Sequence, residues 1–343
     1  MPIYNHAHYL IEAVESVLNQ TELPQRVLLI DDCSSDDSAA IAASYAKHYD
    51  FIEFHQNTSQ MGLNRILNEQ VASVTTEYVF FMASDDSIHP ELCEVATGLL
   101  SKHPEAGVFS ALSNIIDEKG CFVRRYYAPI VSLKPIYLSS AKCKKLFHSD
   151  GNWIVGCTRF FRTKTIKEIG GFPEEMHSFS DTYVSTAVLA KHGACFCPRY
   201  LSKFRISGEN YSLRVMRNSV LLKQIMQQVH KSFIQGGYLT EQEANLWKKR
   251  FTLSAILALF CGNKYFNLVM LKDFFPNKFP LAKKMVFFCY PVLSIRNHFI
   301  NGMLLYILMR PRDLLQRVYR YLFFTLPCRL RSLNDDYIRG ADE

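Results

Sequence analysis

The chain has 343 residues, of which 48% are hydrophobic and 21% are charged. These values are typical of a folded globular protein, and no Gly/Ser-rich, Pro-rich or repeated segment interrupts the sequence, so an intrinsically disordered or repeat protein is excluded. A chain of this length can bury a large core, either as one large domain or as a domain with an appendage.

The net charge of +7 hides an asymmetry between two parts of the chain. Residues 1–212 contain 19 Lys and Arg against 24 Asp and Glu, a net charge of −5, whereas residues 213–343 contain 20 against 8, a net charge of +12. We therefore expect the two parts to face different partners.

The ten cysteines are scattered along the chain. The closest pair, Cys195 and Cys197, lacks the second pair or the histidines that a zinc site requires. The chain does not open with a basic segment followed by an apolar one, which is the pattern of an export signal. We therefore expect reduced thiols and a cytoplasmic location.

Predicted helices and strands alternate along the first part of the chain. In the segment 8–20, Leu10, Val14 and Val17 belong to an apolar stripe at helical spacing. The expected elements, in chain order, are helix 8–20, strand 26–32, helix 38–49, a helix near 63–73 and strand 78–83. Strands that alternate with helices of this length predict crossover connections and an α/β fold with a mixed, mainly parallel sheet.

Residues 118–150 give weak signals, and the pattern sharpens again from Trp153. The further expected elements are strand 107–117, a strand through Phe160 and Phe161, a helix near 163–169, helix 181–192 ended by Gly193, and strand 200–206.

Two pairs of aspartates follow predicted strands, namely Asp31 with Asp32 and Asp85 with Asp86. Ligands of open α/β sheets bind beyond the carboxyl ends of the strands, where both pairs are expected. Two adjacent carboxylates repel each other unless a cation or hydrogen-bond donors offset the repulsion. Mg²⁺ and Mn²⁺ are typically held by one or two carboxylates, with water and phosphate oxygens completing the shell. Asp85 and Asp86 therefore fit a metal–diphosphate site.

Beyond Tyr211 the composition changes to long helical segments rich in Phe, Leu, Lys and Arg. The longest uncharged apolar runs there, 285–295 and 299–309, are each about half of the ~20 residues that a membrane-spanning helix needs. Basic residues flank both runs, a pattern typical of helices that lie in a membrane interface. An ordinary helical subdomain that buries these faces internally is the alternative, and the sequence leaves both open.

Several segments, in this order, resemble the signature segments of family 2 glycosyltransferases with the GT-A fold. They are MPIYNHAHYLIEAVESVLNQT, VLLIDDCSSDDS, EYVFFMASDDSIHPE, FFRTKTIKEIGGFPE, SDTYVSTAVLAKHG and the region of Arg205. The resemblance implies a GT-A domain over residues 1–212 with a truncated first strand, followed by a basic helical region over residues 213–343. It also implies a nucleotide-diphosphate sugar as donor and Mg²⁺ or Mn²⁺ as cofactor.

The resemblance implies roles for residues near the nucleotide. Pro2, Tyr4 and Asn5 match the segment that closes over the base, with Tyr4 stacked on it. Asp31 and Asp32 match the acids that contact base and ribose, and we expect the more direct contact from Asp32. From the residues alone, Tyr4 is equally consistent with a packing role, and either aspartate with a cap on the turn that follows.

Four further residues complete the expected site. Asp86 matches the acid that reaches the metal, and Asp85 the acid that contacts the ribose, or the metal through water. Asp181 matches the catalytic base, although a carboxylate there also fits a helix N-cap. Arg65 is a candidate for holding a phosphate, or an exposed helix residue.

The sequence departs from the family pattern in three places. Met1 stands where a full apolar strand usually precedes the Pro-x-Tyr-Asn segment, Ala83 replaces an acid, and Ser180 replaces the Glu before the base. Ala83 leaves fewer groups for the metal, and Ser180 changes the expected contacts with the acceptor.

The resemblance predicts an inverting glycosyltransferase of bacterial cell-surface polysaccharide synthesis. It would act on a glycan or lipid-linked acceptor, at the inner face of the membrane and without nucleic acid. A catalytically inactive glycosyltransferase-like component of an envelope assembly is the alternative. A signalling receiver domain also begins with an apolar strand ending in Asp-Asp, but too much ordered chain follows here.

Overall fold

The computed structural model describes residues 1–126, 128–206, 212, 215 and 218–261. The chain divides into two compact units. The first comprises Met1–Lys145 with Asn152–Gly208, and the second comprises Leu146–Gly151 with Glu209–Glu343. The predicted apolar runs 285–295 and 299–309 lie outside the described residues.

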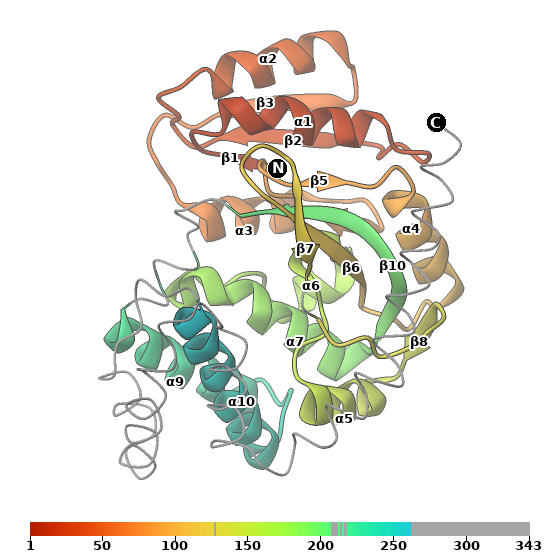
Figure 1. Ribbon diagram of the computed structural model, residues 1–343, viewed down its shortest axis with the longest axis vertical. Helices are drawn as coiled ribbons and strands as arrows, with labels where there is room; N and C mark the ends of the chain where they lie inside the picture. The colour runs from red at the N-terminus through yellow and green to blue at the C-terminus, as the bar shows by residue number, and fades with distance from the viewer. Residues whose placement is uncertain (127, 207–211, 213–214, 216–217, 262–343) are drawn as a thin grey trace. The chain divides into compact units, whose positions relative to one another are not determined.

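A small parallel sheet opens the first unit. Its strands are β1 (Pro2–Ile3), β2 (Val27–Asp31) and β3 (Ile52–Gln56), in that spatial order. The register pairs Ile3 with Asp31 and Asp31 with Gln56, so the three strands end at the same edge. Helices α1 (Ala7–Leu18) and α2 (Ser38–His48) pack against each other beside this sheet (Figure 1).

A larger mixed sheet forms the rest of the first unit. The strand order is β4-β9-β6-β10-β5, with β7 paired to β6 and β8 to β10. The bounds are β4 (Tyr78–Phe80), β5 (Ser87–Ile88), β6 (Val108–Ile116), β7 (Phe122–Arg125), β8 (Ile136–Leu138), β9 (Phe160–Arg162) and β10 (Ala194–Arg205). The α/β class with a mixed sheet is confirmed. A mainly parallel arrangement holds for the small sheet, whereas in the larger one β6–β10 is the parallel pair among the described strands.

Helices flank both sheets of the first unit. They are α3 (Leu63–Ser73), α4 (Leu92–Lys102), α5 (Ser140–Asp150, which runs on into the second unit), α6 (Thr163–Ile169) and α7 (Ser180–His192). One buried cluster includes side chains from both sheets, such as Leu29 of β2, Phe109 of β6 and Phe160 of β9. The rings of Phe80 and Phe160 stack with their centroids 4.6 Å apart, which fixes β4 against β9. This shared core places the strand ends that carry the aspartates.

The described part of the second unit contains helices α9 (Ser219–Gln235) and α10 (Glu241–Cys261). The Asn218 side chain caps α9 by accepting a hydrogen bond from the Leu221 amide at 3.0 Å. The rings of Phe233 and Trp247 meet edge to face at 4.9 Å and join the two helices. None of the described helices is long and apolar enough to cross a membrane.

Candidate active site

Asp31 ends β2 with a carboxylate that no solvent reaches. Its Oδ2 accepts a hydrogen bond from the Ser34 amide at 3.1 Å, so one oxygen caps the following turn, as the alternative reading of the sequence allowed. Its Oδ1 has no hydrogen-bond partner within the described part of the chain. A buried carboxylate oxygen left without a donor is costly, and this one is suited to accept a hydrogen bond from a ligand.

Asp32 is occupied by the loop that leads to α3. Its Oδ1 accepts hydrogen bonds from Asn57 Nδ2 and from the Met61 amide, both at 2.8 Å. Its Oδ2 accepts one from the Gly62 amide at 2.9 Å. Asp32 therefore fixes the conformation of this loop with both of its carboxylate oxygens. Of the two aspartates, Asp31 is the one with a carboxylate oxygen that accepts no hydrogen bond from the described residues. The prediction that Asp32 makes the more direct ligand contact remains a prediction.

The segment after β1 is tied to the turn after β2. Asn5 and Cys33 have φ angles of 54° and 66°, a region that costs energy for residues other than glycine. Oδ1 of the Asn5 side chain accepts a hydrogen bond from the Ser35 backbone amide at 2.8 Å. The backbone amide of Asn5 donates a hydrogen bond to Ser34 Oγ at 2.9 Å. Pro2 lies within β1, and Tyr4 is exposed between these anchors. The exposed Tyr4 ring is available to a ligand at this edge.

His6 connects this segment to the second aspartate pair. Its Nδ1 lies 2.8 Å from the hydroxyl of the buried Ser84, and its amide donates to Ser38 Oγ at 3.0 Å. Ser84 directly precedes Asp85, and Ser38 follows the turn after Asp31 and Asp32. His6 therefore links the segments that carry the two aspartate pairs. His6 is not among the residues predicted for the site, since no periodic or family signal in the sequence distinguishes it.

Asp85 and Asp86 lie in the turn between β4 and β5. The Asp86 amide donates to the Ala83 carbonyl at 3.4 Å, and its Oδ1 accepts a hydrogen bond from the Arg205 amide at 2.9 Å. Burial first, and then the charge of Asp85, raise the pKa of the Asp86 carboxyl well above its ordinary value, while Arg205 acts in the opposite direction. A cation would offset both causes.

The two carboxylates at this turn are suitable ligands for a divalent metal ion such as Mg²⁺ or Mn²⁺. Among the described residues, no donor reaches Asp86 Oδ2, and no group of three or more His, Cys, Asp or Glu side chains forms a closed cage. Hard cations accept one or two carboxylates when a ligand phosphate completes the shell. Asp85 and Asp86 therefore suit an ion that arrives with its ligand.

Asp181 lies in the first turn of α7, whose N-cap is Phe179 with no side-chain cap. The alternative that Asp181 is the N-cap is therefore wrong. Its Oδ2 accepts a hydrogen bond from Arg159 Nη2 at 2.9 Å, and its Oδ1 accepts one from the Thr182 hydroxyl at 3.1 Å. The side chain remains 42% exposed, so the carboxylate is accessible although it is held in place.

The charges of Asp86 and Asp181 act on two neighbouring side chains, the buried Cys157 and the partly buried Tyr126. Burial raises the pKa of the Cys157 thiol to about 12, with the Asp86 charge next in effect. Burial likewise raises the pKa of the Tyr126 phenol to about 12, with smaller contributions from Cys157 and Asp181. Tyr126 packs against the buried cluster that includes Cys157. The charges of Asp86 and Asp181 thus act on two side chains that pack together, although the two acids are distant in sequence.

Arg65 is not brought to the aspartates by any described contact. Its side chain is 60% exposed on α3, and its Nε lies 3.9 Å from Glu69 one turn away. Its neighbour Asn64 contacts the segment that precedes Asp181. Asn64 Nδ2 donates to the His177 carbonyl at 2.9 Å, and Asn64 Oδ1 accepts a hydrogen bond from the Ser180 hydroxyl at 2.9 Å.

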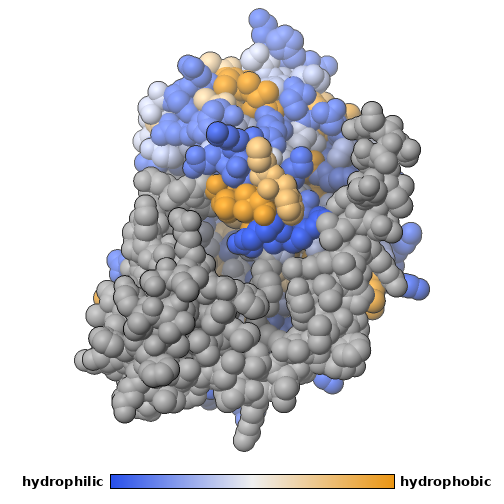
Figure 2. All heavy atoms as spheres, viewed as in Figure 1, coloured by the Kyte–Doolittle hydropathy of each residue, from blue (hydrophilic) through white to orange (hydrophobic). Residues whose placement is uncertain are grey.

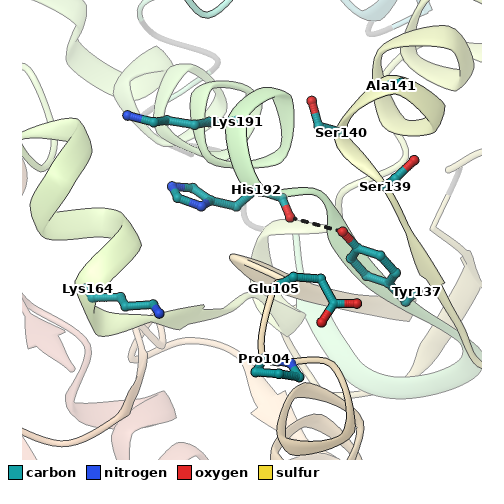
Figure 3. A pocket seen from close by; sticks show the side chains of 9 residues that line it. All are labelled: Pro104, Glu105, Tyr137, Ser139, Ser140, Ala141, Lys164, Lys191 and His192. Atoms are coloured by element: carbon teal, nitrogen blue, oxygen red, sulfur yellow. Dashed lines mark hydrogen bonds between the residues drawn. The ribbon is translucent and has the colours of Figure 1, made fainter.

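A hollow of about 570 Å³ lies beside the amino-terminal ends of β6 and β10 in the larger sheet (Figure 3). Lys164, Lys191, His192, Glu105 and Tyr137 are among the residues that line it. Lys191 and His192 both pair with Glu168, and no aspartate of the candidate site borders the hollow. The candidate site is therefore at the other end of the strands.

The amino-terminal part of the chain is similar to known glycosyltransferases. The model of the family "Glycosyl transferase family 2" matches residues 1–169. An uncharacterized glycosyltransferase of Rickettsia conorii is 26% identical over 209 residues, which cover 61% of this chain and 32% of the relative. The match thus spans about a third of that relative's length.

Solved structures resemble this chain at low identity. TarS of S. aureus, residues 1–349 in complex with UDP-GlcNAc, superposes with a TM-score of 0.61 and 17% identity over 80% of this chain and 78% of that one. A mannosyltransferase from Pyrobaculum calidifontis, in complex with GDP-Man and Mn²⁺, gives a TM-score of 0.56 and 15% identity over 91% and 85% of the two chains. At this identity the likeness shows the fold.

Proposed function

Because residues 1–169 match the model of glycosyl transferase family 2 and the fold resembles that of solved glycosyltransferases, we propose that the chain is a GT-A glycosyltransferase that transfers a sugar from a nucleotide-diphosphate donor to an acceptor hydroxyl. The observation that carries this proposal is the placement of Asp31, Asp86 and Asp181. One buried oxygen of Asp31 lacks a donor, Asp86 is buried beside a second acid, and Asp181 is held but accessible. We assign the catalytic domain to residues 1–212.

The donor would bind at the ends of β1 and β2. Tyr4 offers an exposed aromatic face for the base, and Asp31 Oδ1 offers an acceptor for a base or ribose N–H or O–H group. Asn5 and Asp32 hold the loops around this place in their shapes. The complexes of TarS with UDP-GlcNAc and of the mannosyltransferase with GDP-Man support a nucleotide-sugar donor of this general kind.

Asp86, together with Asp85, would hold a Mg²⁺ or Mn²⁺ ion. When bound, such an ion offsets the negative charge of the departing diphosphate. The Mn²⁺ in the complex of the mannosyltransferase supports this assignment. The buried Asp86 lies where its Oδ1 is fixed by the Arg205 amide, so its other oxygen has a defined direction.

Asp181 would act as general base. Its carboxylate takes the proton of the acceptor hydroxyl while the oxygen of that hydroxyl forms a bond to the anomeric carbon. The bond between the anomeric carbon and the diphosphate oxygen breaks with its electron pair, and the nucleoside diphosphate departs. A single displacement of this kind inverts the anomeric configuration. Arg159 orients the base by hydrogen bonds to its carboxylate and to its backbone carbonyl.

The acceptor would be a glycan or a lipid-linked sugar in cell-surface polysaccharide synthesis at the inner face of the membrane. The net charge of +12 over residues 213–343 supports peripheral contact with an anionic bilayer. On β7, Phe122 and Val123 are 61% and 45% exposed and are followed by Arg124 and Arg125. Figure 2 shows an apolar patch next to hydrophilic surface on one face of the molecule. Apolar side chains beside basic ones suit an interface with lipid.

An inactive, scaffold-like protein is the alternative function, favoured by Ala83 at a position where the family often has an acid. Titration calorimetry with UDP- and GDP-sugars, with and without Mn²⁺, separates the two proposals. An enzyme is expected to bind one donor class in a Mn²⁺-dependent way and to release the nucleoside diphosphate when an acceptor is supplied. Absence of Mn²⁺-dependent heat with every donor would support the scaffold.

A further inference from the structure

We infer that Arg205 and Glu12 form a clamp that positions Asp85 and Asp86 for the metal ion. This inference rests on the proposed function and assigns two further positioning residues to it. Neither residue is expected to touch the substrate. Both act on the turn that carries the two metal-binding acids.

Arg205 grips this turn through its backbone and its side chain. Its amide donates to Asp86 Oδ1 at 2.9 Å, and its Nε donates to the Asp85 carbonyl at 2.8 Å. Its Nη1 donates to the Asp117 carbonyl at 3.0 Å, in the turn between β6 and β7. The side chain is 2% exposed, so these hydrogen bonds form away from water. One residue at the end of β10 thus fixes both neighbouring acids.

Glu12 of α1 completes the clamp from the other side. Its Oε2 pairs with Arg205 Nη2, and its Oε1 accepts a hydrogen bond from the Ser87 hydroxyl at 3.1 Å. The Arg205 guanidinium also lies over the Tyr9 ring of the same helix, 4.6 Å from its centroid. A buried guanidinium without a counter-ion is strongly destabilising, so Glu12 is needed to keep Arg205 in this position.

The clamp matters for the metal because a divalent ion accepts only a narrow range of ligand geometry. Residues that orient ligands without touching the metal typically change metal affinity or activity by about 10–100-fold when they are replaced. Arg205 and Glu12 meet this description, since they contact the residues on both sides of Asp86 and Asp86 itself. A change in the clamp would therefore move the carboxylates and leave the nucleotide edge at Tyr4 and Asp31 intact.

The first unit contains a matched control for this pair. Arg162 is also buried and pairs with Glu77, and its other donors bond the Leu100 carbonyl at 2.8 Å and the Ala106 carbonyl at 3.2 Å. Glu12 and Glu77 are 45% and 63% exposed, so each partner of a buried arginine is itself accessible. The Arg162–Glu77 pair contacts none of the candidate site residues. Loss of Glu77 therefore reports the stability effect alone.

The test compares Glu12→Ala with Glu77→Ala in the full chain. Each folded variant is titrated with Mn²⁺ in the presence of UDP, and separately of GDP, and the nucleotides are also titrated without metal. Glu12→Ala is expected to weaken Mn²⁺ binding by about 10-fold or more and to leave metal-free nucleotide binding unchanged. Glu77→Ala is expected to lower the melting temperature and to keep the wild-type Mn²⁺ affinity.

Glu12→Gln serves where Glu12→Ala does not fold, because it keeps the shape and one hydrogen-bond acceptor for Arg205. It is expected to recover part of the lost Mn²⁺ affinity. Wild-type Mn²⁺ affinity in the folded Glu12 variants would overturn the clamp and leave the proposed function standing. A wild-type chain without Mn²⁺-dependent binding to either nucleotide would overturn the proposed function and the clamp together.

Discussion

Arg159 donates to Asp181 twice, from Nη2 to the carboxylate Oδ2 at 2.9 Å and from Nη1 to the backbone carbonyl at 2.8 Å. A third hydrogen bond, from Nη1 to Ser185 Oγ at 2.7 Å, anchors the guanidinium on the next turn of α7. Arg159 is largely buried, whereas the Asp181 carboxylate is accessible. The proposed base is therefore held from within the fold and open to an acceptor from outside.

Replacement of Arg159 by Lys is expected to lower turnover by about 100-fold, because Lys retains the charge but loses the planar fork that orients Asp181. The Michaelis constant for the donor is expected to stay near the wild-type value. Steady-state kinetics with donor and acceptor varied separately measure both quantities. Arg26→Lys, at an exposed ion pair with Glu53, is the control and should change neither. Wild-type turnover in Arg159→Lys would contradict the orienting role.

Replacement of Asp181 by Asn is expected to reduce sugar transfer by about 10²–10⁴-fold, since Asn cannot accept the acceptor proton. Asn keeps the size of the side chain and an oxygen for Arg159, so donor and Mn²⁺ binding should be retained. Calorimetry checks binding, and product analysis checks transfer. Unchanged turnover would remove Asp181 from the role of base.

Replacement of Asp86 by Asn is expected to stabilise the protein in a pH-dependent way. The folded pKa of Asp86 is raised, first by burial and then by Asp85, above the ordinary value of 3.8. At pH values between the ordinary pKa and the raised folded pKa, the folded chain binds more protons than the unfolded chain. The contribution of Asp86 to the free energy of unfolding is therefore fully present below the ordinary pKa and is lost as the pH rises through the folded pKa. Asn cannot ionise, so the variant does not lose stability at this position as the pH rises.

Melting temperatures measured without metal at several pH values test this expectation. The gain of Asp86→Asn over wild type should be near zero at about pH 4 and should increase towards about pH 7. The same variant should bind Mn²⁺ less tightly in the presence of nucleotide. Asp50→Asn, at an exposed position, is the control and should follow the wild-type profile. A gain that is independent of pH would disagree with the assigned cause.

Replacement of Tyr4 by Ala is expected to weaken nucleotide binding by about 0.5–1.5 kcal/mol, the usual contribution of an aromatic pair, whereas Tyr4→Phe should keep most of the affinity. Calorimetry with the nucleotide diphosphate of the preferred donor measures the difference. Tyr49→Ala, an exposed aromatic residue directly after α2, should bind like wild type. Equal affinity of Tyr4→Ala and wild type would indicate that Tyr4 does not stack on the base.

Sedimentation with liposomes tests the proposed membrane contact. The full chain is expected to pellet with anionic vesicles and to be released by salt, because the basic residues of 213–343 are attracted to the surface charge and salt screens that attraction. Vesicles of neutral lipid are the control. Equal partition between the two kinds of vesicle would argue against an electrostatic contact.

Periodic segments of the sequence predicted their elements closely. The predicted helices 8–20 and 63–73 correspond to α1 and α3, because several turns of apolar repeat define a helix face. The strand β5 has two residues and was not predicted, since two residues carry no periodicity. The strand expected over 200–206 begins at Ala194, where residues buried on both faces hide the alternation.

The candidate site, too, was predicted in part from local sequence patterns and decided in part by the tertiary structure. The sequence by itself determined which acids end strands, because an apolar run followed by Asp31 or Asp85 and Asp86 is a local pattern. Only the tertiary structure decided that Asp31, and not Asp32, keeps an oxygen without a donor. It also decided that Arg205 reaches Asp85 across 120 positions and Glu12 across 193. Such contacts depend on how strands and helices align in space, and no local spacing of residues encodes that alignment.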